Sequence, residues 1–207
     1  MGFYDRYVGP RIVSCLCSLE DITEQRRLVL PKAHGVVLEV GIGSGLNLPH
    51  YDPAKVERVI GVDPGEGFLA LGKERCGNAQ VPLELIQAPA ENIPLDDGIA
   101  DTAVLTYTLC SVSDPQQALR EIRRVLKPDG TLIFCEHGKA DSASVVRWQD
   151  RLNPIWNVLA CGCYLNRDTV GLLAGAGFQI GEIERFYLPR TPKPVGFHCR
   201  GVASLSA

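Results

Sequence analysis

Several kinds of segment are absent from this 207-residue chain. No apolar run reaches the roughly 18 residues that a membrane-spanning helix needs. Residues 8–19 do not form a secretory signal, because Arg11 and Ser14 interrupt the apolar stretch. No repeat or low-complexity segment is visible, and 45% hydrophobic with 22% charged residues is an ordinary globular composition. We therefore expect one cytoplasmic domain without stable membrane insertion.

A strong charge of one sign is also absent. The chain has 21 basic and 24 acidic residues, for a formal net charge of -3. Such a balance gives no general attraction to nucleic acid or to an anionic membrane. We expect no nucleic-acid partner, and the composition does not indicate the oligomeric state.

The eight cysteines form no CxxC pair. Most of them lie inside apolar segments, which is typical of buried free thiols. Cys161 and Cys163 have one residue between them, whereas zinc ligands are usually separated by two to four, and no second such pair with a nearby histidine follows. We expect no bound metal.

From residue 36 onward, short apolar segments alternate with amphipathic ones. The apolar segments are rich in Val, Ile, Leu, Thr or Phe and predict buried strands at residues 36–40, 58–62, 83–88, 102–107 and 131–136. This alternation predicts an α/β protein with a mostly parallel sheet and helices on both faces. Asp114 is placed to cap a helix with a long apolar stripe, which Pro128 to Gly130 would end.

The two ends of the chain complete the predicted sheet and its helices. Residues 9–30 predict one or two helices, and residues 145–161 predict a helix interrupted at Asn153 and Pro154. After a further helix at 168–176, residues 178–187 and 197–204 predict two final strands that pair antiparallel. The expected total is seven strands.

A glycine-rich turn directly follows the first predicted strand. Glu39 precedes Gly41, Gly43 and Gly45, which alternate with other residues and let the backbone approach a ligand closely. A dinucleotide-binding turn has its third glycine one place later, where this chain has Leu46. The turn alone leaves both a nicotinamide cofactor and a plain tight turn without a ligand open.

Two further motifs follow at the ends of the next strands. Asp63 ends the second strand, where a carboxylate can accept both hydroxyls of a ribose. Ala90 and Glu91 follow the third strand. Together with the glycine turn, this order of motifs over residues 36–137 resembles the class I S-adenosylmethionine-dependent methyltransferases.

The resemblance implies a Rossmann-like methyltransferase sheet and S-adenosylmethionine as cofactor, with S-adenosylhomocysteine as product. It implies that the glycine turn lines the methionine part, that Asp63 holds the ribose, that Ala90 and Glu91 border the adenine, and that Thr106 faces the methyl group. The full set of expected cofactor contacts is Glu39, Gly41, Gly43, Gly45, Asn47, Asp63, Pro64, Ala90, Glu91, Thr106 and Tyr7.

From about Gly35 to the final strand, the chain resembles a narrower group, which contains the microsomal thiol S-methyltransferases. The likeness rests on residues 105–112, 134–137, 153–156 and 163–169. It implies a small-molecule acceptor, most simply a thiol or sulfide. Those proteins begin with a hydrophobic anchor that this sequence does not show, and Ile42 and Ser44 replace the Cys and Thr common in their glycine turn.

This comparison suggests three parts: an N-terminal helical lid (1–34), a cofactor-binding half (35–137) and a substrate-side half (138–207). His137 is the candidate catalytic base, because it follows the fifth strand at the edge where open α/β sheets bind ligands. Tyr107, His137 and Trp156 are the expected substrate contacts, with Trp148 as a second aromatic wall. Tyr4 and Tyr7 are candidates for folding over the cofactor.

Two other functions remain open at this point. One is N-, O- or C-methylation of a small metabolite, a quinone precursor or a phospholipid head group. The other is a cofactor-binding module without catalysis. Nothing in the sequence identifies the methyl acceptor.

Overall fold

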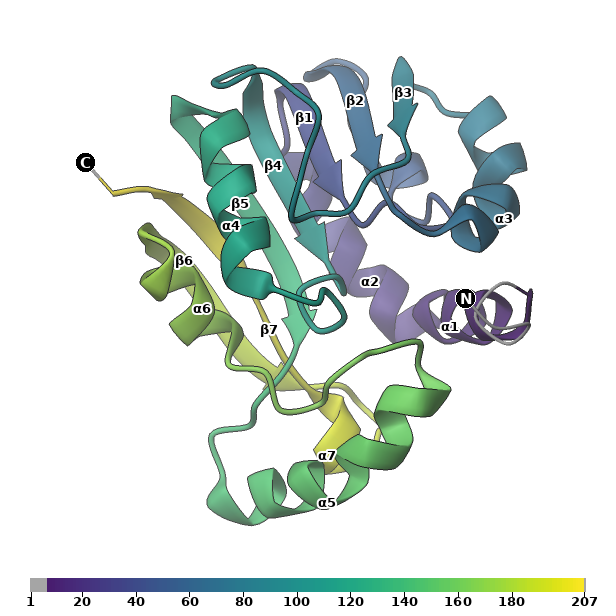
Figure 1. Cartoon of the computed structure of the whole chain (residues 1–207), viewed down its shortest axis with the longest axis vertical. Coiled ribbons are helices and arrows are strands. Elements are labelled where there is room, and N and C mark those ends of the chain that lie inside the picture. The colour runs from purple at the N-terminus through teal and green to yellow at the C-terminus, as the bar shows by residue number, and fades with distance from the viewer. Residues whose placement is uncertain (1–6, 207) are drawn as a thin grey trace.

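A seven-stranded sheet is the centre of the computed structural model, which describes residues 7–206 (Figure 1). The strands are β1 (Gly35–Val40), β2 (Val56–Val62), β3 (Leu83–Ile86), β4 (Ala100–Thr106), β5 (Leu126–His137), β6 (Phe178–Tyr187) and β7 (Phe197–Leu205). They lie in the order β3-β2-β1-β4-β5-β7-β6. The first five are parallel to one another, and β7 is antiparallel to both β5 and β6. The predicted seven-stranded, mostly parallel α/β sheet is thereby confirmed.

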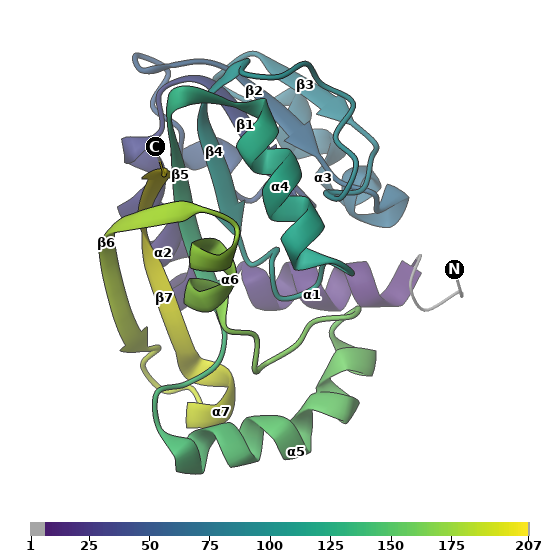
Figure 2. The ribbon, with the colours of Figure 1, turned by 60° about the vertical axis from the view of Figure 1, so that its left-hand side comes forward.

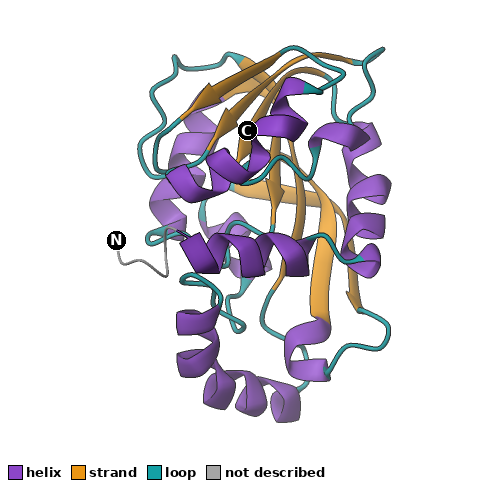
Figure 3. Ribbon diagram, turned by 90° about the vertical axis from the view of Figure 1, so that its right-hand side faces the viewer, coloured by secondary structure: helices purple, strands orange, loops and turns teal. Residues whose placement is uncertain are grey.

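Helices lie on both sides of this sheet (Figure 3). They are α1 (Gly9–Cys17), α2 (Glu20–Val29), α3 (Glu66–Gly77), α4 (Pro115–Val125), α5 (Ala143–Leu159), α6 (Thr169–Gly175) and α7 (Lys193–Gly196), with short 3-10 turns η2 (Leu30–Lys32) and η3 (Leu48–His50). Among the described residues, no helix combines the length and apolarity required to cross a bilayer.

The two largest hydrophobic clusters follow from the alternation of side chains along the strands. Leu38 packs into a cluster with the apolar stripe of α4, whereas its neighbour Val37 packs on the other face with Val29 and Leu30. The expected cap of α4 is confirmed, since Oδ1 of Asp114 accepts a hydrogen bond from the backbone N–H of Gln117 at 2.9 Å.

The expected interruption at Asn153 and Pro154 is wrong, because α5 continues through both residues to Leu159. Proline removes one backbone donor, so the carbonyl of Asp150 loses its helical partner. Asp150 is exposed, and water can replace that partner. A surface helix therefore tolerates a proline that would break a buried one.

The start of β5 also differs from the prediction. The helix α4 ends at Val125 and β5 begins at Leu126, so Pro128 to Gly130 lie within the strand and not in a separate turn. The pairing of β4 with β5 shifts register between Ala100 and Thr102. This irregularity accommodates a proline, which cannot donate a hydrogen bond to a regular ladder.

The carboxyl ends of β1, β2, β4 and β5 meet at one edge of the sheet. The helix α1 runs across this edge, and α5 lies beyond it (Figure 2). Ligands of open α/β sheets bind outside the carboxyl ends of the strands, at the point where the strand order reverses. Here that point lies between β1 and β4, which are neighbours in the sheet.

Candidate active site

A cavity of about 1230 Å³ opens at this edge. It exceeds the roughly 300–1,000 Å³ typical of a pocket for one drug-sized ligand, so it has room for two small molecules. Of the residues expected from the sequence to form the site, those that line the cavity are Glu39, Gly41, Gly43, Asn47, Asp63, Pro64, Ala90, Glu91, Thr106, Tyr107, His137 and Trp156.

The glycine turn after β1 uses its three glycines for different purposes. All three have positive φ, at 74° for Gly41, 56° for Gly43 and 72° for Gly45. A Cβ on Gly41 would lie 2.3 Å from Oγ1 of Thr108, whereas a Cβ on Gly43 would meet nothing closer than 3.8 Å. Gly41 therefore permits close packing of the chain, and Gly43 leaves open space at the cavity wall.

Asp63, at the end of β2, is fixed by the turn. Its Oδ2 accepts the backbone N–H of Gly43 at 2.9 Å, and its Oδ1 accepts that of Gly65 at 2.7 Å. Burial raises the pKa of this carboxyl, and the two backbone hydrogen bonds oppose that effect. The side chain thus presents a rigid acceptor at the cavity wall.

Glu39 is the centre of a buried polar network beneath the cavity. Its oxygens accept the side-chain amide of Asn47 at 2.9 Å and the hydroxyl of Tyr51 at 2.7 Å. The same amide nitrogen also donates to Thr106, and Oδ1 of Asn47 accepts from Arg26 at 3.0 Å. Burial raises the pKa of Glu39 to about 7, although both hydrogen bonds lower it.

Glu91 borders the cavity, but its carboxylate accepts hydrogen bonds from the protein backbone. Its Oε1 accepts the backbone N–H groups of Ser113 and Asp114 at 2.9 and 3.0 Å. The residue therefore ties the loop after β3 to the start of α4, and Ala90 lies buried beside it.

Comparison with known proteins agrees with this arrangement. Residues 38–134 match the sequence model of a methyltransferase domain. The chain is 38% identical to human thiol S-methyltransferase TMT1B over 171 residues, which covers 81% of this chain and 69% of that protein. Human thiol S-methyltransferase TMT1A is 35% identical over the same shares. The chain belongs to the class I S-adenosylmethionine-dependent methyltransferases.

Solved structures of low sequence identity show the same fold. An S-adenosylmethionine-dependent methyltransferase from Aquifex aeolicus has a TM-score of 0.63 at 20% identity, covering 94% of this chain and 97% of its own. One from Leishmania major has a TM-score of 0.70 at 14% identity, covering 97% and 80%. This methyltransferase therefore has the expected Rossmann-like sheet.

S-adenosylmethionine is the methyl donor of this family, and the cavity suits it. The cofactor carries a sulfonium and an ammonium group, and five of the cavity's residues are acidic: Asp21, Glu39, Asp63, Glu66 and Glu91. Arg26 is the single Lys or Arg side chain among the described residues that line the cavity. This excess of acidic groups favours a cationic ligand.

The far end of the methyltransferase cavity carries sulfur and imidazole groups. Nε2 of His137, at the end of β5, lies 3.0 Å from Sγ of Cys163, and the indole N–H of Trp156 donates to that sulfur at 3.3 Å. Interaction with the Cys110 thiol lowers the pKa of Cys163 against the opposing effect of burial, and His137 lowers it further. Burial favours a neutral imidazole, but the Cys163 sulfur outweighs it and raises the pKa of His137.

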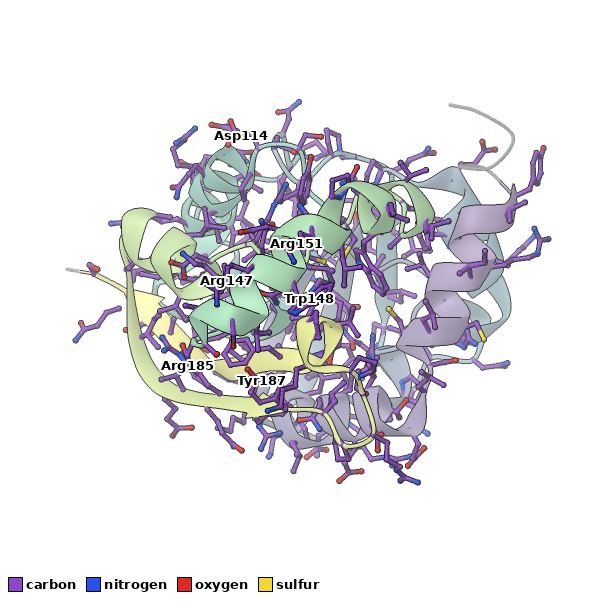
Figure 4. The ribbon with its side chains drawn as sticks, turned by 90° about the horizontal axis from the view of Figure 1, so that it is seen from below. Asp114, Arg147, Trp148, Arg151, Arg185 and Tyr187 are labelled. Atoms are coloured by element: carbon purple, nitrogen blue, oxygen red, sulfur yellow. The ribbon has the colours of Figure 1, made fainter. Side chains whose placement is uncertain are left out.

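Three residues expected at the site lie elsewhere. Gly45 does not line the cavity; a Cβ there would lie 2.9 Å from Cδ1 of Leu48, so this glycine serves packing behind the turn. Tyr7 does not line it either, and the residue is 44% exposed. Trp148 is 54% exposed on α5, where the guanidinium of Arg151 lies over its ring (Figure 4). Tyr4 lies outside the described residues.

The exposure of Trp148 follows from where the cavity meets α5. The cavity meets α5 only in its last turn, at Trp156, Asn157 and Val158, whereas Trp148 lies about two turns earlier and is exposed. The helical pattern of a sequence does not say which part along a helix reaches a pocket. The expectation that Trp148 forms a second aromatic wall of the acceptor pocket is therefore wrong. The expected contact of Tyr7 with the cofactor has no support in this geometry.

Several residues of the site were missed from the sequence. Arg26 reaches the cavity from α2, and Tyr51 reaches Glu39 from the loop after η3. Cys110 and Cys163 flank His137, although they are distant from it in sequence. Nothing local marks Arg26 or Cys110, since a charged residue in a helix or a thiol in an apolar segment is ordinary. Cys163 was considered only as a metal ligand beside Cys161, and their spacing argued against that. Only the tyrosine hydroxyl near a glycine turn offered a weak indication.

Proposed function

We propose that this methyltransferase transfers the methyl group of S-adenosylmethionine to the sulfur of a small thiol or sulfide. The observation that carries the proposal is the far end of the cavity, where the thiols of Cys110 and Cys163 and the imidazole of His137 lie beside apolar side chains. The two human relatives named above, which are thiol S-methyltransferases, support the same acceptor class.

The cofactor is proposed to occupy the acidic end of the cavity. Glu39 and Asn47, with Gly41 and Gly43, would receive the methionine part, and Asp63 with Pro64 would receive the ribose. Ala90 and Glu91 would border the adenine, and Thr106 would face the methyl group. Bound S-adenosylmethionine supplies an electrophilic methyl carbon, and these side chains orient it toward the acceptor.

The lining beyond Thr106 argues against a phosphate-bearing acceptor. Arg26 is already engaged, since it donates to Asn47 and to the carbonyl of Cys17 and lies 5.1 Å from the ring centre of Tyr107. Burial lowers the pKa of His198 to about 4, so this neighbour of His137 is neutral at pH 7. A neutral, partly apolar acceptor fits these walls better than a phospholipid head group.

His137 is proposed to act on the acceptor. A free thiol with a pKa near 8.5 is only a few per cent ionised at neutral pH, so the protein gains by promoting the thiolate. The expectation that His137 does this as a general base stays a prediction. Tyr107 and Trp156 would flank the acceptor, and a bound acceptor would displace water from between them.

The proposal also assigns a role to each of three segments of the chain. Residues 1–34 would cover the cavity as a helical lid, residues 35–137 would hold the cofactor, and residues 138–207 would shape the acceptor side. The contribution of α1 and α2 to the cavity wall, through residues such as Ser14 and Arg26, supports the first assignment. A cytoplasmic location and the absence of a nucleic-acid partner stay predictions.

A panel of acceptors tests the acceptor class. The full chain is incubated with S-adenosylmethionine and, in separate reactions, with small thiols, phenols, amines and phospholipids, and both S-adenosylhomocysteine and the methylated product are quantified. We expect thioether formation with thiols alone, and Asp63→Ala as a control should reduce it. Turnover of phenols, amines or quinone precursors with none of thiols would move the enzyme to N-, O- or C-methylation.

A further inference from the structure

Three side chains from separate parts of the chain meet at the acceptor end of the cavity. Cys110 follows β4, His137 ends β5, and Cys163 follows α5. One donor atom of each lies within 4.8 Å of the other two. All three line the cavity, with both cysteines buried and the histidine half-buried.

This spacing is close to that of ligands around one tetrahedral zinc ion. Zn–S bonds of about 2.3 Å and Zn–N bonds of about 2.0–2.1 Å put neighbouring ligand atoms roughly 3.5–3.8 Å apart. The present 3.0 Å between Nε2 of His137 and Sγ of Cys163 needs to lengthen only slightly. Two thiolates and one imidazole are a donor set that zinc prefers over harder cations.

A hydrogen bond to one of the three side chains and open space beside them would both suit a bound metal ion. The indole N–H of Trp156 donates to Sγ of Cys163, and such contacts orient a ligand and stabilise its charge. Because the three donors line a cavity, a metal held by them would have its fourth position toward that space. Zinc with three protein ligands and one open position is the arrangement of catalytic sites, whereas structural sites are closed by four.

We propose that Cys110, His137 and Cys163 bind a zinc ion whose fourth position takes the sulfur of the methyl acceptor. The acceptor part of this statement rests on the proposed function. It departs from the expectation of no metal, because the ligands converge from three segments that show no ligand spacing in the sequence. His137 is then a ligand of the metal that activates the thiol, in place of a free base.

The chemistry balances with the protein, zinc and the known cofactor alone. Binding of the acceptor forms a Zn–S bond, breaks its S–H bond and releases the proton to water. A sulfur lone pair then forms the new bond to the methyl carbon while the bond from that carbon to the cofactor's sulfur breaks and leaves its electron pair there. The neutral thioether is a poor zinc ligand and departs, so the fourth position is free again.

Cobalt serves as the spectroscopic probe, since Co²⁺ takes the same tetrahedral sites and absorbs visible light. The full chain is kept reduced, stripped with a chelator and titrated with Co²⁺ alone. We expect one ion per chain, with thiolate-to-cobalt charge-transfer absorption and the strong visible bands of a four-coordinate ion, and displacement by Zn²⁺. Addition of a small thiol should shift the visible bands, whereas its S-methyl product should not.

Variants identify the ligands. Cys110→Ser, Cys163→Ser and His137→Ala should each weaken metal binding by more than the roughly 10–100-fold that loss of an outer contact costs. Cys199→Ser is the matched control, because it removes a buried thiol of β7 that does not line the cavity. Circular dichroism and binding of S-adenosylhomocysteine confirm that each variant is folded.

The outcomes separate this proposal from the proposed function. Failure of the folded wild-type chain to bind Co²⁺, or binding that survives in Cys163→Ser, overturns the metal site even if thiols are methylated. A site that binds Co²⁺ as expected, but whose bands no thiol shifts, overturns the acceptor part of the proposal. Thiol methylation that continues at an unchanged rate in the chelator-treated enzyme also overturns that part.

Discussion

The carboxylate of Asp63 illustrates how one side chain combines structural and binding duties. It accepts two backbone N–H groups, from Gly43 and Gly65, and still faces the cavity. A carboxylate has about four acceptor positions, so two remain for a ligand. Fixed in this way, it can receive hydroxyl groups with little loss of side-chain entropy.

The first prediction concerns Asp63→Ala. Loss of charge-assisted hydrogen bonds should weaken binding of S-adenosylhomocysteine by about 1.5–3 kcal/mol, roughly 10- to 150-fold. Titration calorimetry measures the dissociation constant directly. Asp96→Ala is the control, because Asp96 is exposed and outside the cavity, and its affinity should be unchanged. Equal or tighter binding of NAD by the wild-type chain would contradict the assignment.

The second prediction uses the buried carboxyl of Glu39, whose pKa burial raises to about 7 from an ordinary 4.5. Between these values the folded state holds a proton that the unfolded state has lost. The contribution of Glu39 to stability is therefore fully present below about pH 4.5, falls as pH rises to about 7, and stays low above it.

Glu39→Gln removes this titration while keeping a polar side chain of the same shape. The unfolding free energy of the variant relative to wild type should rise by about 3 kcal/mol between pH 4.5 and pH 8 in the absence of cofactor. Denaturant titrations at several pH values measure it, and Glu57→Gln, which replaces an exposed glutamate of β2, provides the baseline. A difference independent of pH would show that Glu39 titrates normally.

The glycine turn between β1 and η3 contains positions of two kinds. Gly41 packs against Thr108, whose hydroxyl donates to the carbonyl of Val40, and so joins the turn to the end of β4. Gly43 has open space in front of it and donates its N–H to Asp63. A substitution at Gly41 should therefore lower stability, whereas one at Gly43 should lower ligand affinity.

The third prediction is this contrast between Gly41→Ala and Gly43→Val. The new methyl at Gly41 would collide with Thr108, and positive φ adds strain of about 1–3 kcal/mol, so the melting temperature should fall. The valine at Gly43 carries similar backbone strain, but its Cβ would meet nothing closer than 3.8 Å and its methyl groups would extend the side chain at the cavity wall, so the protein should fold but lose binding of S-adenosylhomocysteine. Thermal melts and calorimetry on both variants test this. Native-like affinity in Gly43→Val would show that the turn does not face the cofactor.

The N-terminal helices connect the cavity to the rest of the fold. The helix α1 crosses the edge of the sheet (Figure 2). The hydroxyl of Ser14 on this helix lies 2.8 Å from that of Ser44 in the glycine turn. Arg26 of α2 donates to Asn47 beneath the cavity. Any opening of α1 therefore exposes the proposed cofactor site and should be resisted by a bound ligand.

The fourth prediction is that S-adenosylhomocysteine slows hydrogen exchange in α1. At a ligand concentration 100 times the dissociation constant, openings that abolish binding become about 100-fold rarer. Exchange measured by mass spectrometry should show this protection in Gly9–Cys17 and much less in Thr169–Gly175 of α6, which contributes nothing to the cavity. NAD at the same concentration is the control ligand. If S-adenosylhomocysteine leaves the exchange rate of α1 unchanged, the N-terminal helices do not act as a lid.

The sequence by itself determined the sheet, the glycine turn and most of the cofactor side. Strand periodicity, the cap at Asp114 and the positions of Glu39 and Asp63 after their strands are local properties, set by which side chains alternate and where a strand ends. In a parallel sheet those ends meet at one edge, so local order was enough to predict that the residues converge. The continuous α5 shows the limit, because solvent exposure at Asp150 decided whether a proline broke the helix.

Only the tertiary structure decided the acceptor side. Cys110 and His137 come together because β4 and β5 are neighbours, and Cys163 joins them because the chain returns after α5. The exposure of Trp148 and the reach of Arg26 to Asn47 were likewise fixed by how helices dock on the sheet. Such contacts depend on packing between segments far apart in the chain, and no spacing within a single segment encodes them.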